Sequence, residues 1–276
     1  MEQQIRSWLQ TQGYPLEMRT AAAYRDAGFR VVQSSYYQDP ESSDWREIDV
    51  VADKTWIAAE TNSVPVRMMF VAECKASRDK PWILFTAKRA LASPSRVVQR
   101  VSNPVGHAWL QIVSRRHDIQ SLRLFRVSPT PAYGIVQALR NQGAQDPTYG
   151  AALSVVKACV ALTRGPFQTH DAGWALVAFP TIVTEARLFQ CSLDLNSAEE
   201  QLELKEVPYG DLVWRNPISQ HPNTIMKVVN IDHLEKLMRT TARSASRLVE
   251  LTLPELANAA GSLDQERRPT SRKRSR

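Results

Sequence analysis

The chain has 276 residues, 43% of them hydrophobic, and is therefore long enough to bury one large core. No apolar run approaches the roughly 18 residues that a membrane helix needs, and the opening Met1-Glu2-Gln3-Gln4 does not resemble a signal peptide. These features predict a cytoplasmic protein with no membrane partner. The three cysteines, Cys74, Cys159 and Cys191, are far apart and indicate neither a disulfide framework nor a zinc site.

The formal net charge of +7 favours a polyanionic partner, and most of this charge is C-terminal. Six of the 35 Lys and Arg residues lie in the last ten positions, which leaves 29 basic against 28 acidic residues in the rest of the chain. A run so poor in apolar residues predicts a disordered basic tail over 261–276 that adds salt-dependent affinity for nucleic acid. A solvated tail without a role is the alternative.

The first predicted helix covers 15–28, with Pro15 in its first turn and Gly28 at its C-terminal end. A β-branched and aromatic strand follows at 29–37, and residues 39–44 have the composition of a turn. Residues 46–51 then form a second predicted strand. A polar loop joins it to a third strand that ends at Lys75.

Charged residues interrupt the second and third strands. Asp49 lies on the second strand, and Glu73 and Lys75 share one face of the third because side chains alternate along a strand. Burying such groups without partners is costly, so a functional role is expected. Paired carboxylates can hold a hard divalent cation, and a neighbouring lysine can orient or deprotonate a water for attack on phosphorus. Glu47 shares the face of Asp49 by alternation, and either replaces it or points to solvent.

No clear strand is predicted between residues 78 and 145. This stretch is interpreted as a helical insertion, with helices at 87–91, 96–101 and 106–113. Its basic residues either serve solubility alone or, as the family resemblance given below implies, form one wall of a nucleic-acid groove.

The second half of the chain begins with a small, apolar helix at 151–162, expected to be buried against the sheet. Lys157 within it is expected either to extend to solvent or, by the family resemblance given below, to lie near the active site. Further strands are predicted at 174–184, 187–193, 202–207 and 212–215, with a turn at 208–211. An amphipathic helix opens at Ile231 and runs to about residue 260.

The order helix, three strands, helix, strand, with Asp49 followed by Glu73-x-Lys75, resembles the PD-(D/E)xK, or restriction-endonuclease-like, nuclease superfamily over about 16–193. The residue before the first acid is Ile48, where the motif has proline. The resemblance implies an α/β fold with a central mixed β-sheet flanked by helices. It implies a nuclease-like domain over 1–230 with a helical insertion at about 78–145, followed by a C-terminal helical segment over 231–260.

The resemblance also implies a metal site and a reaction. Asp49 and Glu73 would bind Mg²⁺ or Mn²⁺, and Lys75 would position the attacking water and offset developing charge. Glu17 matches a further acid that the first helix of this superfamily often places near the metal. The implied reaction is hydrolysis of phosphodiester bonds, with DNA as the expected substrate, in phage defence, restriction or repair.

The sequence does not decide the oligomeric state or the partner of the protein. Cutting both strands of a duplex often requires two active sites and hence a homodimer, while a partner protein of a defence system is the other expectation. The alternative function is a catalytically inactive nuclease-fold module that binds nucleic acid or a protein.

Overall fold

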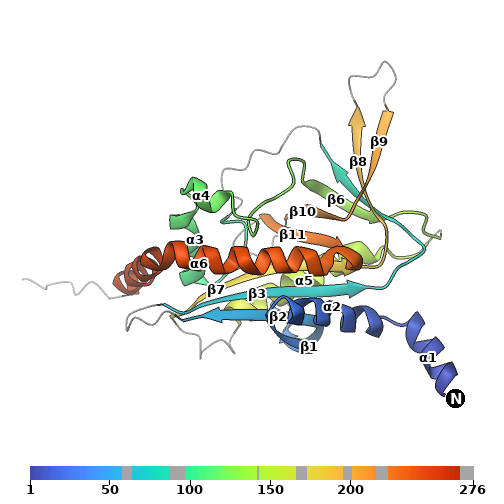
Figure 1. Ribbon diagram of the computed structural model, residues 1–276, viewed down its shortest axis with the longest axis horizontal. Helices are drawn as coiled ribbons and strands as arrows, with labels where there is room; N and C mark the ends of the chain where they lie inside the picture. The colour runs from blue at the N-terminus through green and yellow to red at the C-terminus, as the bar shows by residue number, and fades with distance from the viewer. Residues whose placement is uncertain are drawn as a thin grey trace, which may run out of the picture.

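A computed structural model describes residues 1–57, 64–87, 97–141, 143–165, 173–194, 201–215 and 223–267, with side chains as far as residue 256. Within these residues eleven strands form one mixed sheet, and helices cover both of its faces (Figure 1). The strands are β1 (Arg30–Gln38), β2 (Trp45–Trp56), β3 (Val66–Lys75), β4 (Trp82–Thr86), β5 (Val101–Ser102), β6 (Ala132–Gln137), β7 (Ala175–Thr184), β8 (Leu188–Asp194), β9 (Gln201–Val207), β10 (Tyr209–Arg215) and β11 (Asn223–Asn230). The helices are α1 (Glu2–Thr11), α2 (Tyr14–Asp26), α3 (Pro104–Val113), α4 (His117–Gln120), α5 (Pro147–Arg164) and α6 (Ile231–Arg267).

The strand order across the sheet is β1-β2-β3-β7-β11-β10-β6-β4-β8-β9, and β5 adds a short antiparallel pairing to β7. β1, β2 and β3 are antiparallel neighbours, whereas β3, β7 and β11 run parallel to one another. The carboxyl ends of these three parallel strands therefore meet at one edge of the sheet. The β8–β9 hairpin projects from the body of the molecule (Figure 1).

Alternating residues of the central strand β3 supply two separate cores. Phe70 and Ala72 face a core that includes residues of α2, α3 and α6, whereas Met69 and Val71 face a core dominated by α5. β3 is thus covered on both faces, which explains its nearly continuous apolar sequence.

The structure confirms the predicted order of elements from α2 to β3, whereas α1 ahead of them was not predicted. The helix at 15–28 is α2, and Gly28 follows it with a φ of +85°, a left-handed conformation that glycine adopts readily. The three strands that follow are β1, β2 and β3. The helix at 151–162 and the strand at 174–184 are likewise found, as α5 and β7.

The prediction of a helical insertion at 78–145 is wrong. β4 and β6 in this stretch pair with each other and join the main sheet, next to β8 and β10 respectively. Of the three predicted helices, only that at 106–113 is found, as α3. Residues 97–100 form a turn and bend and Val101 begins β5, while residues 88–91 lie outside the described chain.

Three elements in the C-terminal part also differ from the prediction. β11 was not predicted, yet it lies between β7 and β10 near the middle of the sheet. The predicted turn at 208–211 is shorter, since β9 ends at Val207 and β10 begins at Tyr209. α6 begins at Ile231 as predicted but continues to Arg267, with a kink at Thr252 ahead of Pro254, so residues 261–267 are helical and not a disordered tail. Residues 268–276 lie outside the described chain.

Lys157 neither extends to solvent nor reaches the charged strand ends. Its ammonium group lies 3.0 Å from the Asp39 carboxylate and 2.6 Å from that of Glu41, and its side chain is only 9% exposed. The Asp39 side chain is fully buried and also pairs with Arg46. Lys157 therefore connects α5 to the turn between β1 and β2.

Among the described helices, none has the length and apolar character to cross a membrane.

Candidate active site

The three charged residues singled out in the sequence come together where β2 and β3 meet the carboxyl edge of the sheet. In the register of the parallel strands, Lys75 lies beside Thr184 of β7, and Thr184 lies beside Asn230 of β11. The Thr184 hydroxyl donates to the Lys75 carbonyl at 3.0 Å, which ties the end of β3 to β7.

Glu73 and Lys75 form an ion pair on one face of β3. The Lys75 Nζ donates to Glu73 Oε1 at 2.7 Å, and the two side chains are 34% and 10% exposed. The second carboxylate oxygen, Oε2, accepts a hydrogen bond from the Ser154 hydroxyl of α5 at 3.0 Å. Glu73 is therefore held from two sides, by its own strand and by the helix packed on that face.

Asp49 reaches β3 from the neighbouring strand. Its Oδ2 accepts a hydrogen bond from the backbone N–H of Cys74 at 2.6 Å, so its carboxylate lies beside the residue that follows Glu73. Burial and the Glu73 carboxylate raise the pKa of Asp49 from an ordinary 3.8 to about 7, although the Cys74 hydrogen bond opposes the change. Two carboxylates in so small a space repel each other.

Glu17 also belongs to this acidic site. It lies half-buried in the first turn of α2, and burial raises its pKa above the ordinary value. The carboxylates of Glu47 and Glu73 raise it further, whereas Lys75 opposes them. Glu47 itself is exposed on β2, whereas Asp49 is half-buried and accepts a hydrogen bond from β3.

Lys75 carries its proton in this setting. Burial would lower the pKa of its ammonium group, but the Glu73 carboxylate more than offsets burial and the pKa is raised above its ordinary value. Lys75 is therefore a fixed positive charge near neutral pH.

The donor chemistry of this site suits a hard divalent cation, because Asp49, Glu73 and Glu17 offer carboxylate oxygens and excess negative charge. Their side chains are not already arranged as a ligand set. Among the described residues, no group of three or more His, Cys, Asp or Glu side chains is positioned to hold a metal ion. Lys75 and Ser154 engage the oxygens of Glu73 in this arrangement.

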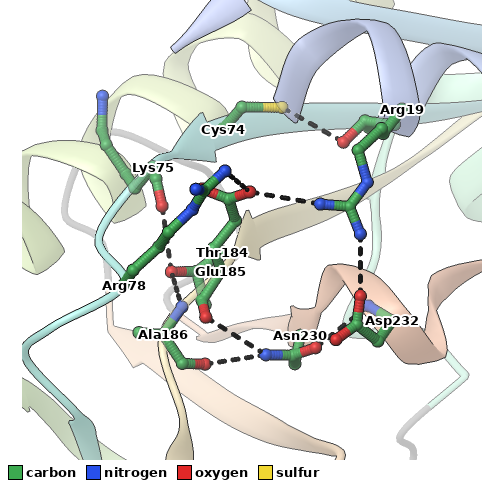
Figure 2. Close-up of polar contacts among 10 residues, drawn as sticks. Arg19, Cys74, Lys75, Arg78, Thr184, Glu185, Ala186, Asn230 and Asp232 are labelled. Carbon is green, nitrogen blue, oxygen red and sulfur yellow. Dashed lines mark hydrogen bonds and ion pairs between the residues drawn. The ribbon is translucent and has the colours of Figure 1, made fainter. Parts of the chain in front are cut away.

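A second polar network braces the same edge of the sheet. Glu185, directly after β7, accepts hydrogen bonds from Arg78 at 2.9 Å and from Arg19 of α2 at 3.1 Å (Figure 2). Arg19 also pairs with Asp232 at the start of α6. The Lys75 side chain points away from Glu185 (Figure 2), so this network fixes the position of the strand ends and does not touch the Lys75 ammonium group.

Sequence reasoning missed Ser154 and the Glu185 network. Ser154 is 81 positions from Glu73, and Glu185 is 107 positions from Arg78, so no local pattern connects these partners. A polar residue within the apolar sequence of α5 was the only signal for Ser154.

Comparison with protein-family models, with curated proteins and with solved structures finds no match to this chain.

Proposed function

We propose that this chain is a metal-dependent nuclease of the restriction-endonuclease-like type, which hydrolyses phosphodiester bonds of DNA. The observation that carries this proposal is the convergence of Asp49 and Glu73 from adjacent strands, with the Lys75 ammonium 2.7 Å from Glu73. A buried pair of like charges costs folding free energy, so its presence at a strand end favours a functional role.

The order of elements around the site supports the same proposal. In chain order, the core reads as one helix (α2), three antiparallel strands (β1 to β3), a second helix (α5) and a fourth strand (β7), with other elements inserted between β3 and α5. β7 pairs in parallel with β3. The strands β4 and β6 between β3 and α5, and the additional strand β11, extend this core at the side away from Asp49.

Asp49, Glu73 and Glu17 are the residues that would hold Mg²⁺ or Mn²⁺. Such an ion, when bound, polarises a phosphoryl oxygen and lowers the pKa of a coordinated water. For Glu73 to act as a ligand, at least one of its oxygens has to leave the hydrogen bond from Lys75 or Ser154.

The protonated state of Lys75 defines its role. An ammonium group cannot remove a proton from water, so Lys75 acts through its charge and its N–H donors. It would orient the scissile phosphate and stabilise the negative charge that develops on the phosphate oxygens. The Glu73 carboxylate keeps Lys75 protonated in the metal-free site, which supports this electrostatic role.

One observation favours the alternative, a nuclease-fold module that binds nucleic acid or a protein without cutting. Both oxygens of Glu73 already have protein partners, and no ready-made ligand group exists within the described part of the chain. In that case the Glu73–Lys75 ion pair would only stabilise the end of β3.

A cleavage assay separates the two functions. Purified protein is incubated with plasmid, single-stranded DNA and RNA, each with Mg²⁺, Mn²⁺ or EDTA. We expect cleavage of DNA with either ion and none with EDTA. Asp49→Ala and Lys75→Ala should each lower the rate by about 100-fold or more, with unchanged circular dichroism.

Lys205→Ala, which removes a lysine from the exposed strand β9, is the matched control and should cut at the wild-type rate. Wild-type cleavage by either active-site variant would remove that residue from the mechanism. DNA binding without cleavage under every ionic condition would favour the inactive module.

A further inference from the structure

A cavity of about 360 Å³ lies on the face of the sheet that α6 covers, away from the acidic strand ends. Its walls come from the segment after α4, from β10 and β11, and from Leu237 of α6. Asp49, Glu73 and Lys75 do not line it. Its volume lies within the range of small-molecule binding sites.

The lining of this cavity is strongly basic. It includes Arg123, Arg126 and Lys227, against a single described carboxylate, that of Asp211. Asp211 is already fully engaged, because its carboxylate pairs with the Lys227 ammonium and accepts a hydrogen bond from the Ser128 N–H at 2.7 Å. The charge of Lys227 is thus balanced within the protein.

The two arginines are not balanced in this way. Arg123 donates to the neutral Tyr209 hydroxyl at 2.9 Å, and no carboxylate contacts Arg123 or Arg126 in the described part of the chain. Both side chains are exposed, so both can turn toward a ligand at the cavity mouth.

A further positive charge lies beneath the cavity floor. Arg100, only 4% exposed, lines an adjoining hollow of about 30 Å³ whose walls also include Arg123, Asp211 and Lys227. Its Nη1 donates to the carbonyls of Gln99 and Ile225, both at 3.3 Å, and its Nε is buried without a hydrogen-bond partner.

Among the described residues no carboxylate contacts Arg100 directly, and Asp211, whose charge acts on it, is already paired with Lys227. Its guanidinium group instead lies 5.6 Å from the ring centre of Phe179 and 6.0 Å from that of Phe125. A buried guanidinium without a directly paired carboxylate is costly, and it makes the potential inside the adjoining cavity more positive. The small hollow around Arg100 has no room for an organic ligand. Arg100 therefore attracts a ligand in the larger cavity through its charge and does not contact it.

The behaviour of Lys227 is consistent with an excess of positive charge. Burial lowers the pKa of its ammonium group despite the adjacent Asp211 carboxylate, and the charges of Arg100 and Arg123 act in the same direction as burial.

We propose that this cavity binds a small phosphorylated anion with at least two negative charges, held by Arg123 and Arg126 at the mouth and attracted by the buried Arg100. Phosphate oxygens match the forked N–H donors of arginine, and a multiply charged group offsets cations that the protein leaves without a counter-charge. The cavity volume fits a ligand of mononucleotide size. This site is independent of phosphodiester hydrolysis at Asp49 and Glu73.

Isothermal titration calorimetry of the full chain in EDTA tests the proposal. The probes are inorganic phosphate, pyrophosphate, a nucleoside triphosphate and a short DNA duplex. We expect pyrophosphate or the triphosphate to bind at one site per chain. The double variant Arg123→Ala with Arg126→Ala should bind at least about tenfold more weakly, which corresponds to about 1.4 kcal/mol.

The matched control is Arg115→Ala with Arg215→Ala, which removes the same charge from exposed positions outside the cavity. This control should retain the wild-type affinity. If both double variants lost the same affinity for the phosphate probes, the loss would be due to net charge alone, and the proposal would be overturned. The absence of binding by any small phosphate at millimolar concentration would overturn it too. Binding of the duplex alone, weakened by the Arg123 and Arg126 changes, would instead assign the arginines to a nucleic-acid surface.

Discussion

Replacing Asp49 with asparagine should stabilise the protein when no divalent cation is present. The substitution removes one of two neighbouring negative charges and keeps an oxygen that can accept the Cys74 hydrogen bond. The pKa of Asp49 rises from 3.8 to about 7 on folding, which corresponds to at most about 4 kcal/mol at 1.36 kcal/mol per unit. Because Asp49 is only partly buried, solvent screening lowers this ceiling, and we expect about 2 kcal/mol.

The pH dependence of this effect has a definite sign. A carboxyl group whose pKa is raised by folding is protonated in both states below about pH 4, where it has no influence on stability. Between pH 4 and 7 the unfolded chain loses the proton while the folded chain keeps it, so the wild type becomes less stable as the pH rises. The advantage of Asp49→Asn should therefore be largest near pH 8 and smaller at pH 5.

Thermal melts in EDTA at pH 5 and pH 8 measure this difference. A gain of about 2 kcal/mol corresponds to roughly 4–8 °C in Tm at pH 8. Excess Mn²⁺ should raise the Tm of the wild type, since a ligand that binds only the folded state stabilises it, and should do little for the variant.

Asp53→Asn, on the same strand, is the control of opposite sign. Asp53 is also buried, but Arg30 and Arg67 lower its pKa, so its removal should destabilise the protein at pH 8. Identical melts of Asp49→Asn and the wild type at pH 8 in EDTA would refute the reasoning that a charged Asp49, buried beside Glu73, destabilises the protein.

Three further predictions concern other parts of the chain. Lys157→Met should destabilise the protein by about 3 kcal/mol in urea denaturation, because it leaves the buried Asp39 carboxylate with Arg46 as its remaining cation; an unchanged midpoint would show that the pair contributes nothing. Gly106→Ala should cost about 1–3 kcal/mol, since an added Cβ would lie 2.5 Å from the Leu176 carbonyl oxygen, whereas Gly150→Ala, with open space around it, should be neutral or stabilising. Deletion of residues 267–276 should flatten the slope of log affinity for DNA against log salt, and an unchanged slope would mean that the tail makes no phosphate contacts.

The segment from α2 to β3 illustrates what the sequence predicts well. α2 has Pro15 in its first turn and ends before Gly28, and β1 to β3 have β-branched or apolar runs separated by turn residues. These signals are local, and so is the spacing of Glu73 and Lys75 that places them on one face. The meeting of Asp49 with β3 was predictable because consecutive strands commonly pair.

β4, β6 and β11 show where local signals fail. β4 has only five residues, and β6 contains Gly134 and follows Pro131, a composition that does not stand out as a strand. β11 carries Lys227 in its middle, which a buried central strand rarely does, and the Asp211 carboxylate that makes Lys227 tolerable comes from β10. Each of these strands is stabilised by neighbouring strands that are distant in the sequence and are known only from the tertiary structure.

The same reason explains the incorrect prediction for Lys157. A lysine in an apolar helix indicates a side chain that reaches solvent unless a buried acid is known to lie opposite. Asp39 was assigned to a turn, where acids are common for local reasons, and nothing between residues 39 and 157 links the two positions.

The parallel pairing of β3 with β7 has a consequence for the protein during its synthesis. β2 leaves the ribosome before β3, but Thr184, whose hydroxyl holds the Lys75 carbonyl, is translated 109 residues after Lys75. At about 5–20 residues per second, a nascent chain carries Asp49, Glu73 and Lys75 for roughly 5–20 s before β7 is available to pair with β3. Ser154 and α5 emerge within the same interval. The acidic site therefore matures late, and a chain truncated before α5 contains all three charged residues without the helix and the strand that hold them in place.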